Sequence, residues 1–361
     1  MPRTLSVSAP GRICLFGEHQ DYLGLPVITA AINLRISITG GFSTDDKIRL
    51  DCPDVGEYDS FAFLYPLRYS KERDYFKSTL NVLQRAGLDL RQAVDVLVRG
   101  NIPINSGTSS SSALVVAWTA FLLKMADDER AHEPETIAKL AHASEVLEFK
   151  EPGGMMDHYA SALGGVQFIS FAGKVQPQSV SVTLGSFVLG DSLEPKDTKG
   201  ILARVKNGAL QGLRSINADI YTIGEKDIDA QAKRLSENQT NVLRSQIVNR
   251  QITQVAKVLM ENNPFDHAQF GHLLTKHHEQ LRDGLGISTP KIERMIHAAR
   301  DAGALGAKIN GSGGGGCMFA YAPQDAEKVA GAIAREGGKA YIVKVDEGVK
   351  IVEHGLPKGR S

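Results

Sequence analysis

The chain has 361 residues, of which 42% are hydrophobic and 23% charged, and its 41 basic side chains balance its 41 acidic ones. A chain of this length is expected to form two domains whose cores need no disulfide or metal for stability. A zero net charge provides no electrostatic footprint for nucleic acid or an anionic membrane, so we expect neither as a partner.

The cysteines and the apolar stretches indicate the cellular location of the protein. Cys14, Cys52 and Cys317 are far apart and form no Cys-x-x-Cys pair, so neither a zinc site nor a redox dithiol is predicted. The first residues lack the long apolar run of a signal peptide, and no stretch approaches the ~18 apolar residues of a membrane span. A reducing, cytoplasmic location is therefore expected.

The first half of the chain alternates strand-like and helical patterns. Alternating apolar and polar residues predict strands, and apolar residues at helical spacing predict helices. The predicted strands are Leu5–Ala9, Ala30–Thr39, Lys47–Cys52, Val94–Val98 and Gly165–Phe171. The predicted helices are Ser109–Met125, Pro134–Phe149 and Met155–Leu163.

The second half is richer in helical patterns. The predicted helices are Ile201–Ala218, Thr240–Glu261, His267–Leu285, Pro290–Ala302 and Asp325–Arg335. The predicted strands are Ala307–Asn310, Cys317–Ala322 and Lys339–Val345. The order strand–loop–strand–helix–strand in the last part of the chain predicts an α+β fold with an antiparallel sheet. We expect a boundary near Gly185–Ser192 and divide the chain into domains of residues 1–187 and 188–361.

The first segment with chemical interest follows the first predicted strand. It reads Pro10-Gly11-Arg12-Ile13-Cys14-Leu15-Phe16-Gly17-Glu18-His19-Gln20-Asp21-Tyr22. A plain surface turn needs neither the arginine nor the Glu-His-x-Asp-Tyr cluster. Carboxylates beside an imidazole suit the recognition of sugar hydroxyls, which they can bind in pairs. The alternative is a solvated loop with incidental charges.

The second segment is a run of four serines, Ser109–Ser112, which opens a helix after the turn-rich stretch 101–108. The first turn of a helix presents unpaired N–H groups and the positive end of the helix dipole, which suit a phosphate. Serine hydroxyls can also bind Mg²⁺, a cation that prefers oxygen ligands. Ordinary helix capping explains one serine but not four.

The third segment is glycine-rich and reads Gly311-Ser312-Gly313-Gly314-Gly315-Gly316. It matches Gly-x-Gly-x-x-Gly, but the dinucleotide-binding fingerprint requires a helix afterwards. Here Cys317–Tyr321 has the pattern of a strand. The chain also lacks a Walker motif and the His-Arg-Asp and Asp-Phe-Gly motifs of protein kinases. A simple hairpin turn would need only one or two glycines.

The fourth segment runs from Glu145 to Asp157, and Asp157 follows the double glycine Gly153-Gly154 at a predicted helix start. A carboxylate placed there could act as a general base toward an acceptor hydroxyl. It could equally be a first-turn charge that the helix dipole favours. The segment alone leaves both readings open.

Together these four segments resemble the motifs of the GHMP small-molecule kinases, the superfamily of galactokinase, homoserine kinase, mevalonate kinase and phosphomevalonate kinase. The resemblance spans Pro10 to Ala322, with the motifs in family order and spacing. It implies a ribosomal-S5-like N-terminal domain and a ferredoxin-like C-terminal domain. It also implies that ATP and Mg²⁺ bind in a cleft, with the phosphates on the serine-rich segment.

Within the superfamily the first segment looks most like galactokinase, and so does Gly154-Met155-Met156-Asp157. The resemblance implies Asp157 as the catalytic base and Arg12 as its partner. The implied substrate-binding residues are Glu18, His19, Asp21 and Gly154. The implied ATP-binding residues are Ser106, Gly107, Ser109, Ser110, Ser111, Ser112, Gly313 and Gly314. The implied magnesium ligands are Ser111 and Glu145.

Two features look more like mevalonate kinase: the four consecutive glycines of the third segment, and Leu23–Val27, which leads directly into apolar sequence. We expect an ATP-dependent sugar kinase, monomeric or homodimeric, that phosphorylates a monosaccharide at its anomeric hydroxyl. Mevalonate kinase and a non-catalytic sugar sensor on the same fold are the alternatives. Mevalonate has few hydroxyls for Glu18 and Asp21, and a sensor usually lacks part of the catalytic set.

Overall fold

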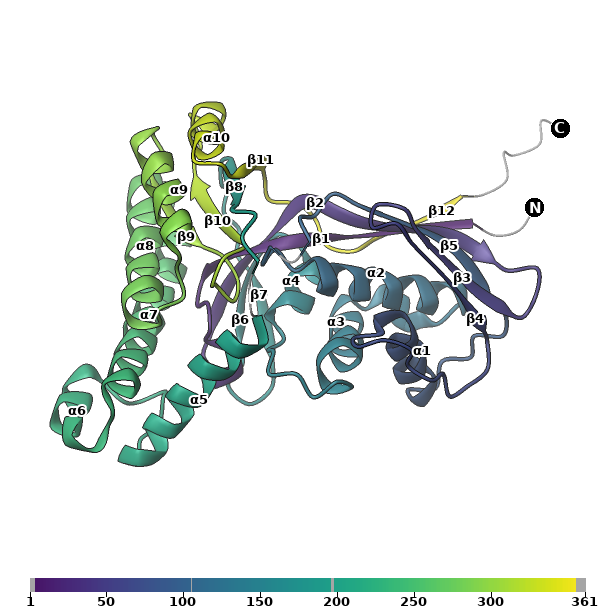
Figure 1. Cartoon of the computed structure of the whole chain (residues 1–361), viewed down its shortest axis with the longest axis horizontal. Coiled ribbons are helices and arrows are strands. Elements are labelled where there is room, and N and C mark those ends of the chain that lie inside the picture. Colours follow the sequence, from purple (N-terminus) through teal and green to yellow (C-terminus); the bar gives the residue numbers. More distant parts are fainter. Residues whose placement is uncertain (1–3, 105, 196–197, 355–361) are drawn as a thin grey trace.

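The structure is a computed structural model that describes residues 4–104, 106–195 and 198–354 (Figure 1). Its larger sheet has eight strands, in the order β12-β1-β2-β5-β3-β4, with β6 paired to β2 and β7 to β6. These strands are β1 (Thr4–Phe16), β2 (Val27–Phe42), β3 (Lys47–Cys52), β4 (Glu57–Ala62), β5 (Val94–Gly100), β6 (Val166–Ser170), β7 (Gln176–Ser179) and β12 (Lys350–His354).

Four helices pack on one face of this sheet (Figure 1). They are α1 (Tyr75–Arg85), α2 (Ser110–Met125), α3 (Pro134–His142) and α4 (Met156–Leu163). Helix α2 is apolar on nearly all sides and lies at the centre of the core, where Trp118 stacks on Phe121 with ring centroids 5.6 Å apart. A helix that is apolar all round is expected to be buried. Its serine-rich N-terminus is therefore held by a rigid core.

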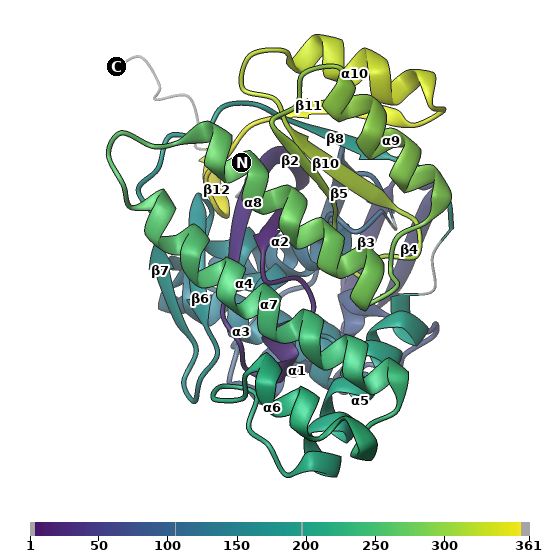
Figure 2. The ribbon, with the colours of Figure 1, turned by 90° about the vertical axis from the view of Figure 1, so that its left-hand side faces the viewer.

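The second layer is an antiparallel sheet in the order β11-β8-β10-β9, with helices packed around it. The strands are β8 (Phe187–Asp191), β9 (Gly306–Ile309), β10 (Cys317–Tyr321) and β11 (Lys339–Val343). The helices are α5 (Thr198–Ile216), α6 (Glu225–Ala230), α7 (Glu237–Met260), α8 (His267–Glu279), α9 (Pro290–Asp301) and α10 (Ala326–Arg335). Figure 2 shows α7, α8 and α9 facing the viewer on this side of the molecule.

The predicted α+β class is confirmed, and most predicted elements occur within a few residues of their expected bounds. The division into residues 1–187 and 188–361 stays a prediction. The structure adds that the chain returns to the first sheet, because β12 pairs antiparallel with β1 from Thr4↔His354 to Ser8↔Lys350. This final strand was not predicted, nor were α1, β4, β7, β8 and α6. No helix in the described part of the chain is long and apolar enough to cross a membrane.

Strand β1 continues well past the predicted end at Ala9. The pairing of β1 with β2 shifts register between Pro10 and Gly11, which accommodates the proline inside the strand. A Cβ on Gly11 would lie 2.8 Å from the carbonyl oxygen of Thr108, and the Arg12 N–H donates to that same oxygen at 3.2 Å. The longer strand thus carries Arg12 to the serine-rich segment.

Two predicted helices are interrupted by wider turns. The helix expected over 134–149 ends at His142 and continues as a π-helix over Ala143–Leu147, and α8 is followed by a second π-helix over Gln280–Gly284. A π-helical turn inserts an extra residue, which shifts every following side chain around the axis, and such turns are frequent at functional sites. The first one contains Glu145, a predicted magnesium ligand.

Candidate active site

A cleft lies where β1, the start of α2 and the start of α4 meet the glycine-rich segment and α5. It brings together most of the residues predicted from the sequence, although they come from three distant segments. The predicted residues that line it are Arg12, Glu18, His19, Asp21, Ser106, Gly107, Ser109, Ser110, Ser111, Ser112, Glu145, Gly154 and Asp157.

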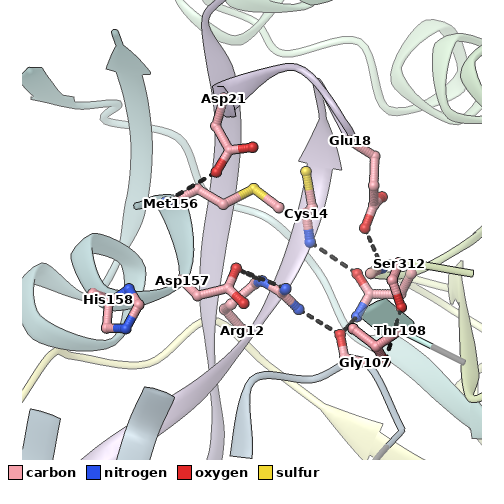
Figure 3. Close-up of polar contacts among 12 residues, drawn as sticks. Arg12, Cys14, Glu18, Asp21, Gly107, Met156, Asp157, His158, Thr198 and Ser312 are labelled. Atoms are coloured by element: carbon pink, nitrogen blue, oxygen red, sulfur yellow. Dashed lines mark hydrogen bonds and ion pairs between the residues drawn. The ribbon is translucent and has the colours of Figure 1, made fainter. Parts of the chain in front are cut away.

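Arg12 and Asp157 form an ion pair in this cleft (Figure 3). The Nε and Nη2 atoms of Arg12 lie 2.8 and 2.7 Å from Oδ1 of Asp157, and Nη1 donates to the carbonyl oxygen of Gly107. The arginine side chain is 4% exposed and the aspartate 27%. Burial raises the pKa of Asp157, but the charge and hydrogen bonds of Arg12, together with Ser109 and His158, outweigh burial and hold that pKa below its usual value. The carboxylate is therefore ionised and reachable from the cleft.

Asp21 lies close to the start of α4, where its carboxylate accepts hydrogen bonds from backbone N–H groups. Its Oδ1 accepts from Tyr22 at 2.9 Å and its Oδ2 from Met156 at 3.4 Å. A Cβ on Gly154 would lie 1.8 Å from Oδ2 of Asp21, so only glycine allows this approach. Burial and the charge of Asp157 raise the pKa of Asp21 to about 6. Asp21 and Gly154 thus form one wall of the cleft beside Asp157, the predicted base.

Glu18 and His19 are almost completely buried, and their polar atoms are engaged inside the protein. Glu18 forms an ion pair with Lys308 and also accepts a hydrogen bond from the N–H of Gly311. His19 Nδ1 lies 2.8 Å from the hydroxyl of Tyr22, and its Nε2 lies 3.1 Å from the carbonyl oxygen of Ser312. Burial lowers the pKa of His19 to about 4, so the neutral ring donates from Nε2 and accepts at Nδ1. Both residues join the first segment to the glycine-rich segment.

The serine-rich segment turns sharply into α2. Ser109 adopts a left-handed conformation (φ +61°) and its side chain does not cap the helix. The first N–H groups of α2 are therefore not satisfied by a capping side chain, which leaves them available to an anionic ligand. Ser106 donates instead to the carbonyl oxygen of Pro103 at 2.8 Å and holds the preceding turn.

Glu145, which lies in the π-helix, lines the cleft near the serine-rich segment. Its Oε2 lies 2.8 Å from Nε2 of His158. Burial raises the pKa of Glu145, but His158 and the hydroxyls of Ser111 and Ser112 outweigh burial and lower it. An ionised carboxylate beside two hydroxyls is a set of hard oxygen donors, and Mg²⁺ typically uses one or two carboxylates together with phosphates and waters. The residues present therefore fit a Mg²⁺–nucleotide complex. The described residues contain no group of three or more His, Cys, Asp or Glu that could hold a metal without a nucleotide.

Not all of the glycine-rich segment faces the cleft. Gly311 and Ser312 line it, whereas Cβ atoms on Gly313 and Gly314 would press against Ile287 and Ile201. All five glycines between positions 311 and 316 have positive φ, so the loop follows a path that other residues rarely adopt. A direct contact of Gly313 or Gly314 with ATP stays a prediction.

Sequence reasoning missed several residues of the cleft, among them Arg73, Tyr75 and His158. Arg73 pairs with Glu151 through two hydrogen bonds of 2.6 and 2.9 Å. Arg73 and Tyr75 reach the cleft from the beginning of α1, which was not predicted. The apolar spacing of Phe76, Leu80 and Leu83 was the signal that could have identified this helix.

A second, more apolar hollow adjoins the cleft at Ser110 and Ser111. Its walls are formed by side chains of β2, β5, α1 and α2, including Ile36, Val98, Phe76 and Leu114. Arg73, Tyr75, Ser110 and Ser111 line both the hollow and the cleft. A ligand that occupies the cleft at the serines can therefore extend a flat apolar group into the hollow.

Models of known protein families match this chain at three places. The model described as GHMP kinases N terminal domain matches residues 74–165, and the model described as GHMP kinases C terminal matches residues 252–340. The galactokinase galactose-binding signature matches residues 2–41, which include Arg12, Glu18, His19 and Asp21.

Individual relatives include both mevalonate kinases and galactokinases. The chain is 31% identical to a mevalonate kinase of Thermococcus onnurineus over 356 residues, or 96% of this chain and 98% of that one. It is 25% identical to a galactokinase of Actinobacillus succinogenes over 342 residues, or 89% and 86% of the two chains. Among solved structures, Lactococcus lactis galactokinase complexed with galactose superposes with a TM-score of 0.84 at 21% identity, over 96% of this chain and 95% of that one.

Proposed function

This chain belongs to the GHMP kinase family of small-molecule kinases, and we propose that it transfers the γ-phosphoryl group of ATP to a monosaccharide hydroxyl. One observation carries the proposal. Asp157, ionised and paired with Arg12, lies between the serine-rich start of α2 and the wall formed by Asp21 and Gly154. Asp157 therefore lies in the same cleft as the two sites that we propose, one for the phosphate donor and one for the hydroxyl acceptor.

The phosphate donor binds at the start of α2. Uncapped N–H groups and the positive helix end attract the phosphates, and Ser111 and Glu145 hold the Mg²⁺ that accompanies them. When bound, the metal neutralises charge on the phosphate oxygens. The apolar hollow that shares Ser110 and Ser111 with the cleft receives the adenine ring.

The acceptor binds against Asp21, with Glu18 and His19 shaping the wall behind it. Asp21 can accept hydrogen bonds from two neighbouring hydroxyls, which is the arrangement a sugar ring provides. Both arginines among the described lining residues are already paired, Arg12 with Asp157 and Arg73 with Glu151. A neutral polyol suits this lining better than an acceptor whose own carboxylate would need a cation.

Asp157 and Arg12 carry the chemistry. Phosphoryl transfer depends mainly on alignment and charge stabilisation, with a carboxylate to orient the hydroxyl and accept its proton. Oδ1 of Asp157 is engaged by the guanidinium of Arg12, which keeps the carboxylate ionised. The same guanidinium offsets negative charge that develops on the transferred group. We propose the anomeric hydroxyl as the acceptor, which supplies the most acidic proton of a free sugar.

Mevalonate kinase is the second candidate, because mevalonate kinases are relatives at 31% identity across nearly the whole chain. Its substrate carries a carboxylate and would need a free cation near Asp21. Galactokinases are relatives at 25% identity, and the galactose-binding signature covers Asp21 and its neighbours. The chemistry of the acceptor wall favours the sugar.

An ADP-release assay on purified protein tests the proposal, with a panel of free hexoses, pentoses and sugar acids alongside mevalonate. We expect turnover with at least one neutral sugar, dependent on Mg²⁺, and none above background with mevalonate. Asp157→Asn is the control for contaminating kinases, because it should abolish most of the signal. Turnover with mevalonate alone would replace the proposal with the second candidate.

A further inference from the structure

Immediately before the glycine-rich segment lies Asn310, a buried residue that is 1% exposed. Its Oδ1 accepts a hydrogen bond of 2.9 Å from the N–H of Cys14 in β1, and its Nδ2 donates one of 2.8 Å to the carbonyl oxygen of Gly107. A backbone donor faces the amide oxygen and a backbone acceptor faces the amide nitrogen, so only one orientation of the amide satisfies both. Asn310 therefore joins β1 to the loop before α2.

The carbonyl oxygen of Gly107 is shared by two donors. Besides Asn310 it accepts a hydrogen bond from Nη1 of Arg12, while the other nitrogens of Arg12 hold Asp157 (Figure 3). Gly107 has a positive φ of 91°, and a Cβ on Gly311 would lie 2.8 Å from its carbonyl oxygen. The direction of this carbonyl is thus set jointly by the glycine-rich segment and by Arg12.

We propose that Asn310 is a positioning residue for phosphoryl transfer, which orients Arg12 and through it Asp157 by fixing the carbonyl of Gly107. This inference rests on the proposed function, in which Arg12 and Asp157 act on the transferred group. The third segment then contributes to catalysis through the asparagine that precedes its glycines, although Gly313 and Gly314 lie away from the cleft.

An aspartate at position 310 is the sharpest test, because it preserves shape and can still accept from Cys14. It cannot donate to Gly107, and its charge draws Arg12 away from Asp157. The groups that act on the carboxyl of Asp157 are Arg12, Ser109, His158 and Asp21. With Arg12 displaced, the pKa of Asp157 rises, so the acid limb of the kcat profile moves to higher pH. We expect Asn310→Asp to lower kcat about 10²-fold, as a small misplacement of reacting groups does, with both KM values within about threefold.

The chain offers a matched control in Asn81 of α1. Its amide also joins backbone groups, accepting from the N–H of Leu67 and donating to the carbonyl of Leu67, both at 2.8 Å, and it is 4% exposed. Neither cavity is lined by Asn81. Asn81→Asp should therefore lower the midpoint of urea unfolding as Asn310→Asp does, but leave kcat and its pH profile unchanged. Asn310→Ala, which adds no charge, should show a smaller loss of kcat.

Several outcomes would overturn the inference. One is an Asn310→Asp enzyme with wild-type kcat and pH profile while Asp157→Asn is inactive; another is an Asn81→Asp enzyme with the same kinetic defect. A wild-type protein that phosphorylates no acceptor would instead refute the proposed function. Even then a crystal structure of Asn310→Asp decides about positioning: a guanidinium of Arg12 turned away from Gly107 supports it, and an unmoved one contradicts it.

Discussion

The two ends of the cleft use polar side chains in opposite ways. At the acceptor end, Glu18 and His19 are buried and engaged with Lys308, Gly311, Tyr22 and Ser312. At the phosphate end, Ser109 leaves the first turn of α2 without a side-chain cap, and Ser110 and Ser111 line both cavities. The polar groups of Glu18 and His19 are thus engaged within the protein, whereas the first N–H groups of α2 are left without a capping side chain.

This difference shows that a motif residue in a cleft need not contact the ligand. Glu18 and Asp21 stand three positions apart in one segment, yet one holds a buried lysine and the other faces Gly154 and the proposed base. Removing a group that holds the wall should alter stability, while removing a group that meets a ligand should alter affinity or rate. The following variants separate these effects.

The largest loss of turnover is expected for a substitution of Asp157, which lies between the acceptor end and the phosphate end of the cleft. Asp157→Asn should lower turnover by roughly 10²–10⁴-fold, the usual contribution of a general base. Both substrates should still bind within a few-fold, because the amide preserves the shape of the side chain. Single-turnover kinetics with radiolabelled ATP measures the rate, and calorimetry measures binding. A variant that transfers phosphate at nearly the wild-type rate would move the base elsewhere.

Glu18→Gln should act mainly on stability. Both Glu18 and Lys308 are at most 1% exposed, and removing one partner of a buried ion pair leaves an uncompensated charge that costs about 3–5 kcal/mol. Urea unfolding measures this loss. The control is Glu57→Gln at the exposed pair with Lys71, which should cost less than about 1 kcal/mol. If Glu18→Gln weakened sugar binding with no loss of stability, Glu18 would be a sugar ligand after all.

Variants at the metal-binding residues should weaken the use of Mg²⁺–ATP. Glu145→Gln removes the charge and Ser111→Ala one hydroxyl oxygen, so we expect at least about tenfold weaker binding for the first and less for the second. Calorimetric titration of ADP with and without Mg²⁺ separates metal from nucleotide affinity. Sugar affinity should not change in either variant. An unaltered dependence on Mg²⁺ in both would place the metal elsewhere.

Sugar affinity should depend on the ionisation of Asp21. The pKa of this group is raised to about 6, so its carboxylate is ionised above that pH and protonated below it. An ionised carboxylate accepts from two hydroxyls, and we therefore expect sugar to bind about tenfold more tightly at pH 7 than at pH 5. Asp21→Ala should bind sugar weakly at both pH values and bind nucleotide normally. A pH dependence that persists in Asp21→Ala would have another source.

Much of the fold could be predicted because it depends on local patterns, and most residues of the cleft could be predicted from the resemblance to the GHMP kinases. Helix α9, for example, starts at Pro290 with Thr289 as its cap, as the sequence indicates. Strand β12 could not be predicted in this way, because it is a short strand at the sheet edge whose place depends on pairing with β1. The π-helix around Glu145 has no local signature either.

The roles of individual site residues were harder to predict than their presence. The sequence places Glu18, His19 and Asp21 within four positions and does not distinguish them. Their roles differ because Lys308, Gly311 and Ser312 meet the first two, and these partners lie almost 300 positions away. Asn310 went unnoticed for the same reason, since its partners belong to β1 and to the loop before α2.

The most direct test of the central claim is to identify the product of the wild-type protein. Phosphorus NMR should follow ATP, Mg²⁺ and the sugar that supports ADP release, with an equal amount of mevalonate in the same tube. We predict one new phosphate resonance, coupled to the anomeric proton of the sugar, that grows as the γ-phosphate of ATP disappears. A phosphate coupled instead to the methylene protons of mevalonate, with the sugar unchanged, would contradict the account.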